Sequence, residues 1–365
     1  MSFIISKKDR NIKGNIKLDG SKSISNRVLI IRALCGDNFE IENLSTSDDT
    51  KAMLKALDQA QGNTARIDVG AAGTTMRFLT AFLSNKEGDW ILTGSERMKQ
   101  RPIGVLVDAL RTLGADIEYI ENEGYPPLRV KGKKMDGGTV NINAGVSSQY
   151  LSALLMIAPV LQNGLSLKLE GDLVSKPYLT MTLKMMNYFE VKSEWIDEQT
   201  IFVPSQSYQT KPFFVESDWS AASYHYALAA FGEEVNLSLE GLLKESLQGD
   251  SVLPSIMKTF GVETVYGDKV VHLSKKESTA SDFQYNFVEC PDIAQTLAVV
   301  CGGLKIKGSF SGLVTLSIKE TDRTAALQEE LAKFDISFTK KQEDEWCLSF
   351  PMVEKAEEEV VDVKT

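Results

Sequence analysis

The sequence contains few histidines and cysteines, and this limits the chemistry that it can support. His225 and His272 are its only histidines, and neither lies beside a candidate nucleophile. The four cysteines are far apart and form no C-x-x-C pair, which argues against a disulfide framework and against a zinc site. Proton transfer would therefore have to use lysine, aspartate or glutamate side chains.

Long hydrophobic runs and an excess of basic residues are also lacking. The longest uncharged apolar stretch, near residues 151–161, is too short to cross a bilayer, and the N-terminal segment has no signal-peptide core. We expect a cytoplasmic protein. The net charge of -10 argues against nonspecific binding to nucleic acid or to an anionic membrane. A chain of 365 residues is too long for one common core, so two domains are expected.

An internal repeat is the clearest sign of organisation. A polar or glycine-containing turn followed by an apolar, helix-like run begins at Gly20, Gly70, Val146, Glu216 and Cys290. The last four starts recur at a period of about seventy residues. A second helix-like segment follows and leads into alternating, strand-like patterns. The sequence thus predicts five copies of a repeat made of helix, strand, helix, strand and strand.

The same period places a further turn just beyond residue 360, where the sequence ends in EKAEEEVVDVKT. Two interpretations stay open at this point. A sixth repeat is missing, or five repeats are the full protein and the acidic end is a solvated tail.

Cationic residues accompany the helix starts in an otherwise acidic chain. A helix N-terminus attracts anions through its free N–H groups, but it supplies only about 0.3 to 1 kcal/mol. A unit charge at close range supplies about 4 kcal/mol at an intermediate dielectric constant. The cations beside the turns are Lys22, Arg27, Arg77, Arg101, Lys176, Lys319 and Arg323. Each one alone is more often a surface charge, but their recurrence in successive repeats predicts a shared site for phosphates and carboxylates.

Two nucleotide-binding motifs are excluded. The turn GSKS is similar to a P-loop, but no glycine lies at the upstream spacing that G-x-x-x-x-G-K-[ST] requires. The segment GAAGTT does not form the dinucleotide fingerprint G-x-G-x-x-G.

A series of motifs between Gly20 and Arg323 carries a resemblance to a known family. The motifs are LDGSKSISNR, AGTTMR, RMKQRPIG, SSQYL, SKPY, the PD of CPDIAQT, and KETDR. In this order and spacing they resemble the 5-enolpyruvylshikimate-3-phosphate synthases, transferases of the shikimate pathway and the target of glyphosate. These enzymes transfer enolpyruvyl from phosphoenolpyruvate to shikimate-3-phosphate in chorismate and aromatic amino acid biosynthesis.

The resemblance implies a two-domain α/β fold, an inverse α/β barrel-like arrangement of β-α-β-α-β-β repeats with three repeats in each domain. Residues 1–18 would form a strand that joins the second domain. Residues 19–214 would form the first domain, with three repeats and the shikimate-3-phosphate site. Residues 215–365 would form the second domain, with two repeats present and the third missing.

The resemblance also implies a set of site residues. Those expected to bind shikimate-3-phosphate are Lys22, Ser23, Arg27, Ser147, Ser148, Gln149, Ser175, Tyr178, Asp292, Thr315 and Lys319. Those expected to bind phosphoenolpyruvate are Lys22, Gly73, Thr74, Arg101, Gln149 and Arg323. Asp292 resembles the proton acceptor of the family and Glu320 its proton donor, and Lys22 is counted with the catalytic residues. No metal or organic cofactor is expected.

Taken one at a time, these residues have simpler readings. The serines could be helix caps, Tyr178 a partly buried aromatic, and the two carboxylates charges at helix ends. Their occurrence together with the cations favours a site. The reaction needs this combination, because protonation of the methylene carbon of phosphoenolpyruvate makes the neighbouring carbon open to attack by a hydroxyl, and the adduct then expels phosphate. Two carboxyls can act as acid and base, and the cations neutralise the substrates and the leaving phosphate.

Some family features are absent from the sequence. Ala71 and Thr315 each stand where the family commonly has Asn; Thr315 can still form a hydrogen bond, whereas Ala71 cannot. The late D-H-R-M motif and a C-terminal lysine, both phosphoenolpyruvate contacts, are not found. We therefore expect the chain to bind shikimate-3-phosphate better than phosphoenolpyruvate, and to be weakly active or inactive as it stands.

Two alternative functions remain. The related UDP-N-acetylglucosamine enolpyruvyl transferases place Asn after the lysine and use a loop cysteine, whereas here Ser23 follows Lys22 and no cysteine lies between Lys86 and Ile103. The other alternative is a catalytically inactive, anion-binding form that has lost its sixth repeat, but intact Asp292 and Glu320 argue against long decay. The expected partners are the two small-molecule substrates, with neither nucleic acid nor membrane, and a monomer is expected.

Overall fold

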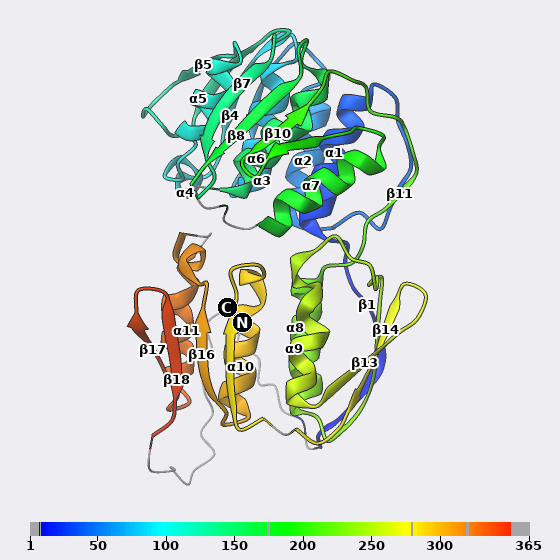
Figure 1. Ribbon diagram of the computed structural model, residues 1–365, viewed down its shortest axis with the longest axis vertical. Coiled ribbons are helices and arrows are strands. Elements are labelled where there is room, and N and C mark those ends of the chain that lie inside the picture. The colour runs from blue at the N-terminus through cyan, green and yellow to red at the C-terminus, as the bar shows by residue number, and fades with distance from the viewer. Residues whose placement is uncertain are drawn as a thin grey trace. The chain divides into compact units, whose positions relative to one another are not determined.

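The computed structural model describes residues 7, 9–145, 147–171, 173, 176–278, 280–318 and 321–351. The chain forms two compact domains (Figure 1). Asp19–Glu216 make up one of them, which we call the 19–216 domain. Met1–Leu18 and Ser217–Thr365 together make up the other, which we call the terminal domain. Within the described ranges, no helix is both long and apolar enough to cross a membrane.

Helices and strands alternate through the 19–216 domain. Its helices are α1 (Lys22–Cys35), α2 (Asp48–Gln59), α3 (Gly73–Ser84), α4 (Glu96–Lys99), α5 (Gly104–Thr112), α6 (Ser148–Ile157), the 3-10 turn η1 (Ala158–Val160) and α7 (Lys176–Tyr188). Its strands are β2 (Ile41–Glu42), β3 (Thr64–Asp68), β4 (Gly88–Thr93), β5 (Asp116–Tyr119), β6 (Leu128–Gly132), β7 (Gly138–Asn143), β8 (Leu165–Glu170), β9 (Glu194–Asp197), β10 (Thr200–Val203) and β11 (Phe213–Phe214).

The terminal domain follows the same alternation. Its helices and 3-10 turns are α8 (Trp219–Phe231), η2 (Gly249–Val252), α9 (Leu253–Met257), η3 (Lys258–Phe260), η4 (Pro291–Ile293), α10 (Ala294–Gly303), η5 (Val314–Ile318) and α11 (Arg323–Ala332). Its strands are β1 (Asn11–Lys17), β12 (Glu234–Glu240), β13 (Val262–Tyr266), β14 (Val270–Lys275), β15 (Asp282–Asn286), β16 (Lys307–Ser311), β17 (Ser337–Gln342) and β18 (Glu345–Ser349).

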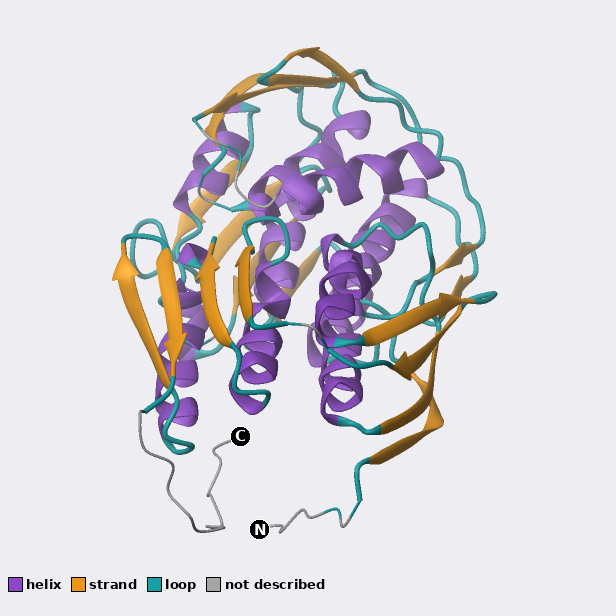
Figure 2. Cartoon of the chain, turned by 60° about the horizontal axis from the view of Figure 1, so that its bottom comes forward, coloured by secondary structure: helices purple, strands orange, loops and turns teal. Residues whose placement is uncertain are grey.

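The four-stranded sheets in the described parts of the chain share one arrangement. Their strand orders are β3-β4-β6-β5, β7-β8-β10-β9, β1-β12-β14-β13 and β15-β16-β18-β17. In each sheet the first two strands run parallel and the remaining neighbours run antiparallel. In the terminal domain, helices cover one face of each sheet (Figure 2). Parallel neighbours need a crossover helix and antiparallel neighbours need only a turn, so this order reproduces the expected β-α-β-α-β-β repeat.

The N-terminal strand β1 belongs to a sheet of the terminal domain, although about two hundred residues of the other domain follow it. It pairs in parallel with β12, from Asn11 opposite Glu234 to Lys17 opposite Glu240. Lys13 and Glu234, both exposed, also form an ion pair of 2.9 Å between Nζ and Oε2. Exposed pairs of this kind contribute only about 0 to 1 kcal/mol, so the backbone ladder holds the strand in place.

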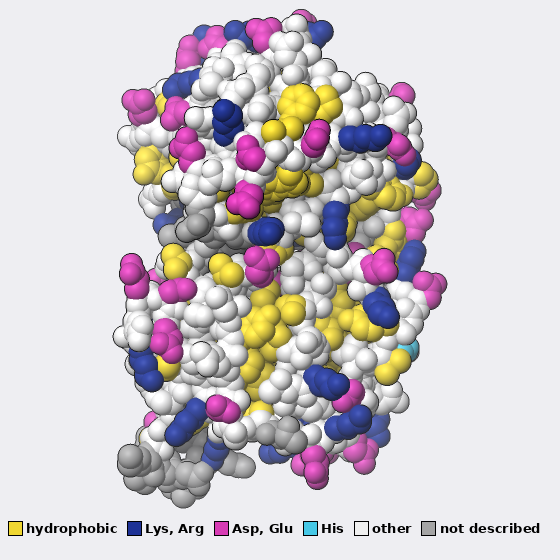
Figure 3. Space-filling view, in the orientation of Figure 1, with side chains coloured by type: hydrophobic (Ala, Val, Ile, Leu, Met, Phe, Trp, Pro, Cys, Tyr) yellow, Lys and Arg dark blue, Asp and Glu magenta, His cyan; other side chains and the backbone are white. Residues whose placement is uncertain are grey.

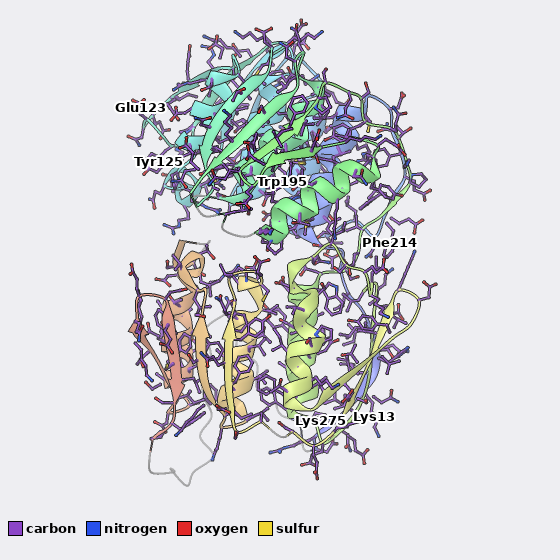
Figure 4. The ribbon with its side chains drawn as sticks, viewed as in Figure 1. Lys13, Glu123, Tyr125, Trp195, Phe214 and Lys275 are labelled. Atoms are coloured by element: carbon purple, nitrogen blue, oxygen red, sulfur yellow. The ribbon has the colours of Figure 1, made fainter. Side chains whose placement is uncertain are left out.

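Lys275, at the end of β14, caps the C-terminal ends of two helical segments of the terminal domain (Figure 4). Its Nζ donates to the carbonyl oxygens of Ala230, in α8, and Phe260, at the end of η3, both at 2.7 Å. The last carbonyls of a helix have no partner within the helix, and a lysine can supply one. Burial lowers the pKa of the Lys275 amine.

The first repeat, whose interval in the sequence is shorter than the others, is also smaller in the structure. Its β2 pairs with β11, far along the chain, and these two short strands form a two-stranded sheet. Side chains supply the hydrogen bonds that a neighbouring strand would otherwise give to this backbone. Asp19 accepts from the Thr46 backbone N–H at 2.8 Å, and the Ser45 N–H donates to the Ser25 hydroxyl at 3.0 Å. Because these partners satisfy the backbone locally, the segment does not need to extend as a strand.

The inner helices of the two domains differ in burial. All residues of α3 are buried, as are Tyr150–Ile157 of α6. In the terminal domain, α8 leaves Tyr224 and Leu228 66% and 51% exposed, and α10 leaves Val299 44% exposed. Hydrophobic side chains gather on the face of this domain that Figure 3 shows. The 19–216 domain therefore encloses its helices more completely.

Candidate active site

The turn before α1 brings the backbone into close contact with a neighbouring segment and places Lys22 at the start of the helix. A Cβ on Gly20 would lie 1.9 Å from the carbonyl oxygen of Asn43, so this position requires glycine. Lys22 follows as the first helical residue, and its side chain is 41% exposed. Its Nζ lies 3.9 Å from Oδ1 of Asp49. Lys22 is thus held at a helix N-terminus, where a ligand can reach it.

Arg27, one turn into α1, is 2% exposed. Its Nε donates to the Thr182 hydroxyl at 2.8 Å, one Nη to the Ser23 carbonyl at 2.9 Å, and the other Nη to the Ser152 hydroxyl at 2.9 Å. The guanidinium carbon lies 5.9 Å from the ring centre of Tyr178. Burial lowers the pKa of the Arg27 guanidinium to about 10, so it remains charged at neutral pH.

Gly73 begins α3 and lies directly against Arg101. A Cβ on Gly73 would be 2.5 Å from one Nη of Arg101 and 2.9 Å from its guanidinium carbon. The same guanidinium is 3.5 Å from the Ala71 carbonyl oxygen. The absence of a side chain at Gly73 therefore lets a cation lie over the first turn of the helix, next to its free N–H groups.

The start of α6 joins the start of α3 through a side-chain hydrogen bond. Ser147 caps α6 by accepting from the Gln149 backbone N–H at 3.3 Å. The side-chain amide of Gln149 donates to the hydroxyl of Thr74, also at 3.3 Å. Ser148, the first residue of the helix, is partly exposed. Residues of two separate motifs are therefore in direct contact.

The helices that carry these residues pack on one another. Helix α1 contacts α3, α6 and α7, and α6 contacts α3 and α7. Arg27 links α1 to α6 and α7 through its hydroxyl partners. Asp49 lies beside Lys22, and its carbonyl accepts from the Thr75 hydroxyl of α3 at 3.0 Å. The 19–216 domain thus brings together residues from its GSKSISNR, AGTTMR, RMKQRPIG, SSQYL and SKPY motifs.

Of the predicted site residues in the terminal domain, the structure describes Asp292, Thr315 and Arg323. Asp292, in η4, accepts from an Nη of Arg323 at 2.7 Å, and the two side chains are 16% and 27% exposed. The cap residue Asp322 accepts from the Thr324 and Ala325 N–H groups, which fixes Arg323 as the first residue of α11. The Thr315 hydroxyl oxygen is buried and has no hydrogen-bond partner in the described part of the chain.

Comparison with known proteins identifies the family. The family model described as EPSP synthase (3-phosphoshikimate 1-carboxyvinyltransferase) matches residues 6–68 and 58–349. The chain belongs to the EPSP synthase family. It is 50% identical over 322 residues to the 3-phosphoshikimate 1-carboxyvinyltransferase of Bacteroides fragilis strain YCH46, covering 88% of this chain and 78% of that protein. The corresponding protein of Aliivibrio fischeri strain ES114 is 42% identical over 348 residues, covering 88% of this chain and 81% of the relative.

Solved structures in the same family have the same fold. An EPSP synthase from Acinetobacter baumannii aligns with a TM-score of 0.75 and 19% identity, covering 94% of this chain and 82% of that one. A second structure of the enzyme from that organism aligns with a TM-score of 0.72. The predicted two-domain α/β fold of the EPSP synthases is therefore confirmed.

Some predicted site residues lie outside the described residues. They are Ser175, Lys319 and Glu320. Among the predicted site residues of the EPSP synthase motifs SKPY and KETDR, the structure describes Tyr178 and Arg323.

Sequence reasoning missed two hydroxyls that hold Arg27. Ser152 and Thr182 are both 0% exposed, and their hydroxyls accept the guanidinium hydrogen bonds that do not go to the Ser23 and Tyr178 carbonyls. A helical spacing could have revealed them. Ser152 lies four residues after Ser148, and Thr182 four residues after Tyr178, so each shares a helix face with a predicted site residue.

Sequence reasoning also missed an acid near Asp292. Asp218 caps α8 by accepting from the Ala221 backbone N–H at 3.1 Å. Its pKa is raised, mainly by burial, and the charge of Asp292 adds to the shift. Ser220, on the same first turn, donates to Asp250, which is 6% exposed. An aspartate before a helix-like run is typical of a helix cap, so the sequence alone does not indicate that Asp218 lies near Asp292.

Proposed function

We propose that this chain transfers the enolpyruvyl group of phosphoenolpyruvate to shikimate-3-phosphate, releasing 5-enolpyruvylshikimate-3-phosphate and phosphate. Family membership supports the reaction, because the relatives above carry the name of this activity at 42% and 50% identity. The single observation that carries the proposal further is the joining of separate motifs. Within the 19–216 domain, direct contacts connect residues from the starts of α1, α3 and α6.

The 19–216 domain supplies the groups that we assign to the anionic parts of the substrates. We assign Lys22, Ser23 and Arg27, together with Ser147, Ser148, Gln149, Ser175 and Tyr178, to shikimate-3-phosphate. Helix N-termini and nearby cations suit phosphate and carboxylate groups, and an arginine can bind either with two parallel hydrogen bonds. Arg27 supports this assignment, since its protein acceptors among the described residues are neutral oxygens.

Gly73, Thr74 and Arg101 are assigned to phosphoenolpyruvate, with Lys22, Gln149 and Arg323. The contact between Arg101 and the bare Gly73 backbone supports this assignment. A cation over a helix N-terminus stabilises negative charge, which in this reaction passes to the departing phosphate. The cation and the helix N–H groups would act on the same anion.

Carboxylates of the terminal domain are assigned to proton transfer. Asp292 would accept the proton of the attacking hydroxyl, and Glu320 would supply a proton to the methylene carbon. Thr315 and Lys319 complete the shikimate-3-phosphate contacts. The ion pair between Asp292 and Arg323 supports this assignment, because it places a carboxylate that can accept a proton directly beside a cation assigned to phosphoenolpyruvate.

We also propose that the protein works as a cytoplasmic monomer that binds neither nucleic acid nor membrane. The net charge of -10 supports this proposal, since both kinds of polyanionic partner attract basic surfaces. Size-exclusion chromatography with light scattering would measure the mass in solution, and a mass of twice 40.3 kDa would contradict the proposed monomer.

Phosphate release from phosphoenolpyruvate tests the reaction. We expect release that depends on shikimate-3-phosphate and is matched one for one by 5-enolpyruvylshikimate-3-phosphate in mass spectrometry. Replacing the acceptor by UDP-N-acetylglucosamine should stop the release. Release with that nucleotide sugar instead, or release without any acceptor, would overturn the proposal.

A further inference from the structure

A pair of buried hydroxyls lies directly against the guanidinium of Arg27. Ser152, on α6, and Thr182, on α7, are both fully buried, and their hydroxyl oxygens are 2.9 Å apart. Each oxygen also receives a hydrogen bond from the Arg27 guanidinium, at 2.9 Å from Nη2 and 2.8 Å from Nε. One edge of the guanidinium, formed by Nε and Nη2, therefore lies against the hydroxyl pair.

The protons of this pair can be assigned one by one. The Thr182 hydroxyl donates to the Tyr178 carbonyl at 2.9 Å, so it has no second proton for Ser152. Ser152 must then donate to Thr182 across the 2.9 Å contact. The Thr182 oxygen accepts from both Ser152 and Arg27, which uses both of its lone pairs. Every donor in the pair thus has one acceptor, and the guanidinium is held in a single orientation.

The hydrogen-bond acceptors around Arg27 are neutral, so they do not cancel its positive charge. Buried arginines are commonly paired with carboxylates, which cancel the charge. Here the acceptors among the described residues are two hydroxyls and the carbonyls of Ser23 and Tyr178, and the aromatic rings of Phe78 and Tyr178 lie 5.4 and 5.9 Å from the guanidinium carbon. No carboxylate lies within hydrogen-bonding distance of it among the residues that the structure describes. These neutral oxygens and aromatic rings offset part of the cost of burying the cation, and a bound anion would offset more of it.

We propose that Ser152 and Thr182 are positioning residues, which fix Arg27 for an anionic group of shikimate-3-phosphate without neutralising its charge. The inference rests on the proposed function, because it takes Arg27 as a contact of that substrate. It extends the substrate site to two hydroxyls that touch no ligand themselves. A carboxylate at either position would hold Arg27 equally well but would compete with the substrate for it.

The terminal domain contains a matched control. Ser223, on α8, and Thr296, on α10, form a buried hydroxyl pair 2.8 Å apart, and Ser223 donates to the Ser220 carbonyl at 2.6 Å. In the part of the chain that the structure describes, neither hydroxyl forms a hydrogen bond with an arginine. Removing a hydroxyl from this pair costs a buried hydrogen bond between helices, as at Ser152 and Thr182, but disturbs no cation.

The first experiment measures the KM of each substrate and kcat for Thr182→Val, Ser152→Ala, Thr182→Ser and Ser223→Ala. A hydrogen bond to a charged group contributes about 1.5 to 3 kcal/mol, so the KM for shikimate-3-phosphate should rise about tenfold to a hundredfold in Thr182→Val and Ser152→Ala. The KM for phosphoenolpyruvate and kcat should change less than about threefold. Thr182→Ser, which keeps the hydroxyl, and Ser223→Ala should resemble the wild type.

Several outcomes would overturn the inference. One is an unchanged KM for shikimate-3-phosphate in folded Thr182→Val and Ser152→Ala, and another is an equal rise in Ser223→Ala. If circular dichroism shows that Thr182→Val does not fold, Ser152→Ala, which removes a single oxygen, decides the question. Where turnover is too slow to measure, calorimetric titration with shikimate-3-phosphate gives the same comparison.

A second readout separates failure of this inference from failure of the proposed function. The Arg27 Nε–H signal in a nitrogen-15 spectrum, assigned by its loss in Arg27→Lys, reports the guanidinium in the absence of substrate. We expect faster hydrogen exchange of that signal in Thr182→Val and no change in Ser223→Ala. Equal exchange in all three proteins would contradict the positioning role, even if the reaction is confirmed. If hydrogen exchange is faster in Thr182→Val but the wild type does not bind shikimate-3-phosphate, the positioning role is supported and the proposed function is wrong.

Discussion

The two domains use the same repeat but carry opposite charges at the starts of α1 and α3 in one domain and of α8 and α10 in the other. In the 19–216 domain, Lys22 begins α1 and Arg101 lies over the first residue of α3. In the terminal domain, Asp218 caps α8 and Asp292 lies in the turn before α10. Helix N-termini favour negative charge in both cases. The first domain adds cations and leaves room for an anionic ligand, whereas the second supplies the anions itself.

This difference shows how a repeated backbone can serve two tasks. A cation beside a helix N-terminus makes a site that binds phosphate or carboxylate. A partly buried carboxylate at the same position has an altered affinity for protons, which is what acid and base catalysis require. The burial that raises the pKa of Asp218 and the burial that lowers the pKa of Arg27 have the same physical cause, since both disfavour the charged form.

Removing the proposed proton acceptor of the terminal domain should have the largest effect. Asp292→Asn keeps the size of the side chain but cannot accept a proton, so we expect kcat to fall by about a hundredfold to ten-thousandfold. Phosphate release under saturating substrates measures this. Glu289→Gln, which changes an exposed carboxylate nearby, serves as the control. Equal activity of the Asp292 variant and the control would remove Asp292 from the proton-transfer step.

Removing a cation from the 19–216 domain should weaken binding. In Lys22→Met the side chain keeps its length and loses its charge, and we expect the Kd for shikimate-3-phosphate to rise about tenfold to a hundredfold. Lys51→Met is the matched control, because Lys51 is 66% exposed and pairs with Asp48 at 3.5 Å in the same domain. Calorimetry measures both, and similar small losses in the two variants would mean that the charge of Lys22 acts only at long range.

Adding one methyl group at Gly73 sharpens the comparison further. Gly73→Ala would place a Cβ 2.5 Å from Arg101, so the guanidinium would have to leave the helix start. We expect the KM for phosphoenolpyruvate to rise about tenfold, the equivalent of one weakened charged hydrogen bond. Gly62→Ala adds the same methyl group where no atom lies within 4 Å. An unchanged KM in Gly73→Ala would show that Arg101 binds equally well from another position.

The smallest effect is a change in the pH dependence of stability. The pKa of Asp218 is raised by burial, so the folded protein holds this proton more tightly than the unfolded chain. Its contribution is fully present below the unfolded-state pKa and is lost as the pH rises through the folded-state pKa. Asp218→Asn, which can still cap α8, should therefore gain stability relative to the wild type as the pH rises from about 4. Urea unfolding across this range measures it.

Asp322 supplies a control of opposite sign in the same domain. This exposed cap of α11 has its pKa lowered by hydrogen bonds from Ala325 and Thr324. Its contribution is present above the unfolded-state pKa and is lost as the pH falls through the folded-state pKa. Asp322→Asn should therefore lose stability relative to the wild type near neutral pH, and lose less in acid. Parallel curves for the two variants would contradict at least one of the two signs.

The sequence predicted the repeat, but it did not predict the strand pairing of the first repeat, in which β2 pairs with β11. Apolar helix-like runs and alternating strand patterns depend on local periodicity, so β-α-β-α-β-β could be expected wherever both patterns occur. The first repeat departs from it because Asp19 satisfies the backbone of Thr46, a contact between residues that are far apart in sequence. Likewise, the pairing of β1 with β12 depends on a register that no local pattern contains.

The candidate site was predicted through motifs, and its supporting residues were not. Lys22, Arg27 and Asp292 carry charges beside predicted turns, which makes them visible in the sequence. Ser152 lies within the apolar run SQYLSALLMI, where a serine resembles an ordinary core residue. Only the folded structure shows that its hydroxyl meets Thr182 and a guanidinium from another helix. The roles assigned to the motif residues stay predictions until the variants above are measured.

Calorimetric titration of the wild-type chain with shikimate-3-phosphate, alongside Lys22→Met, tests the central claim most directly. We predict saturable binding at one site, weakened by added salt because opposite charges are involved, and weakened about tenfold to a hundredfold by the substitution. Absence of binding in the wild type, or equal affinity in Lys22→Met, would contradict the claim that the cationic helix starts of the 19–216 domain hold this substrate.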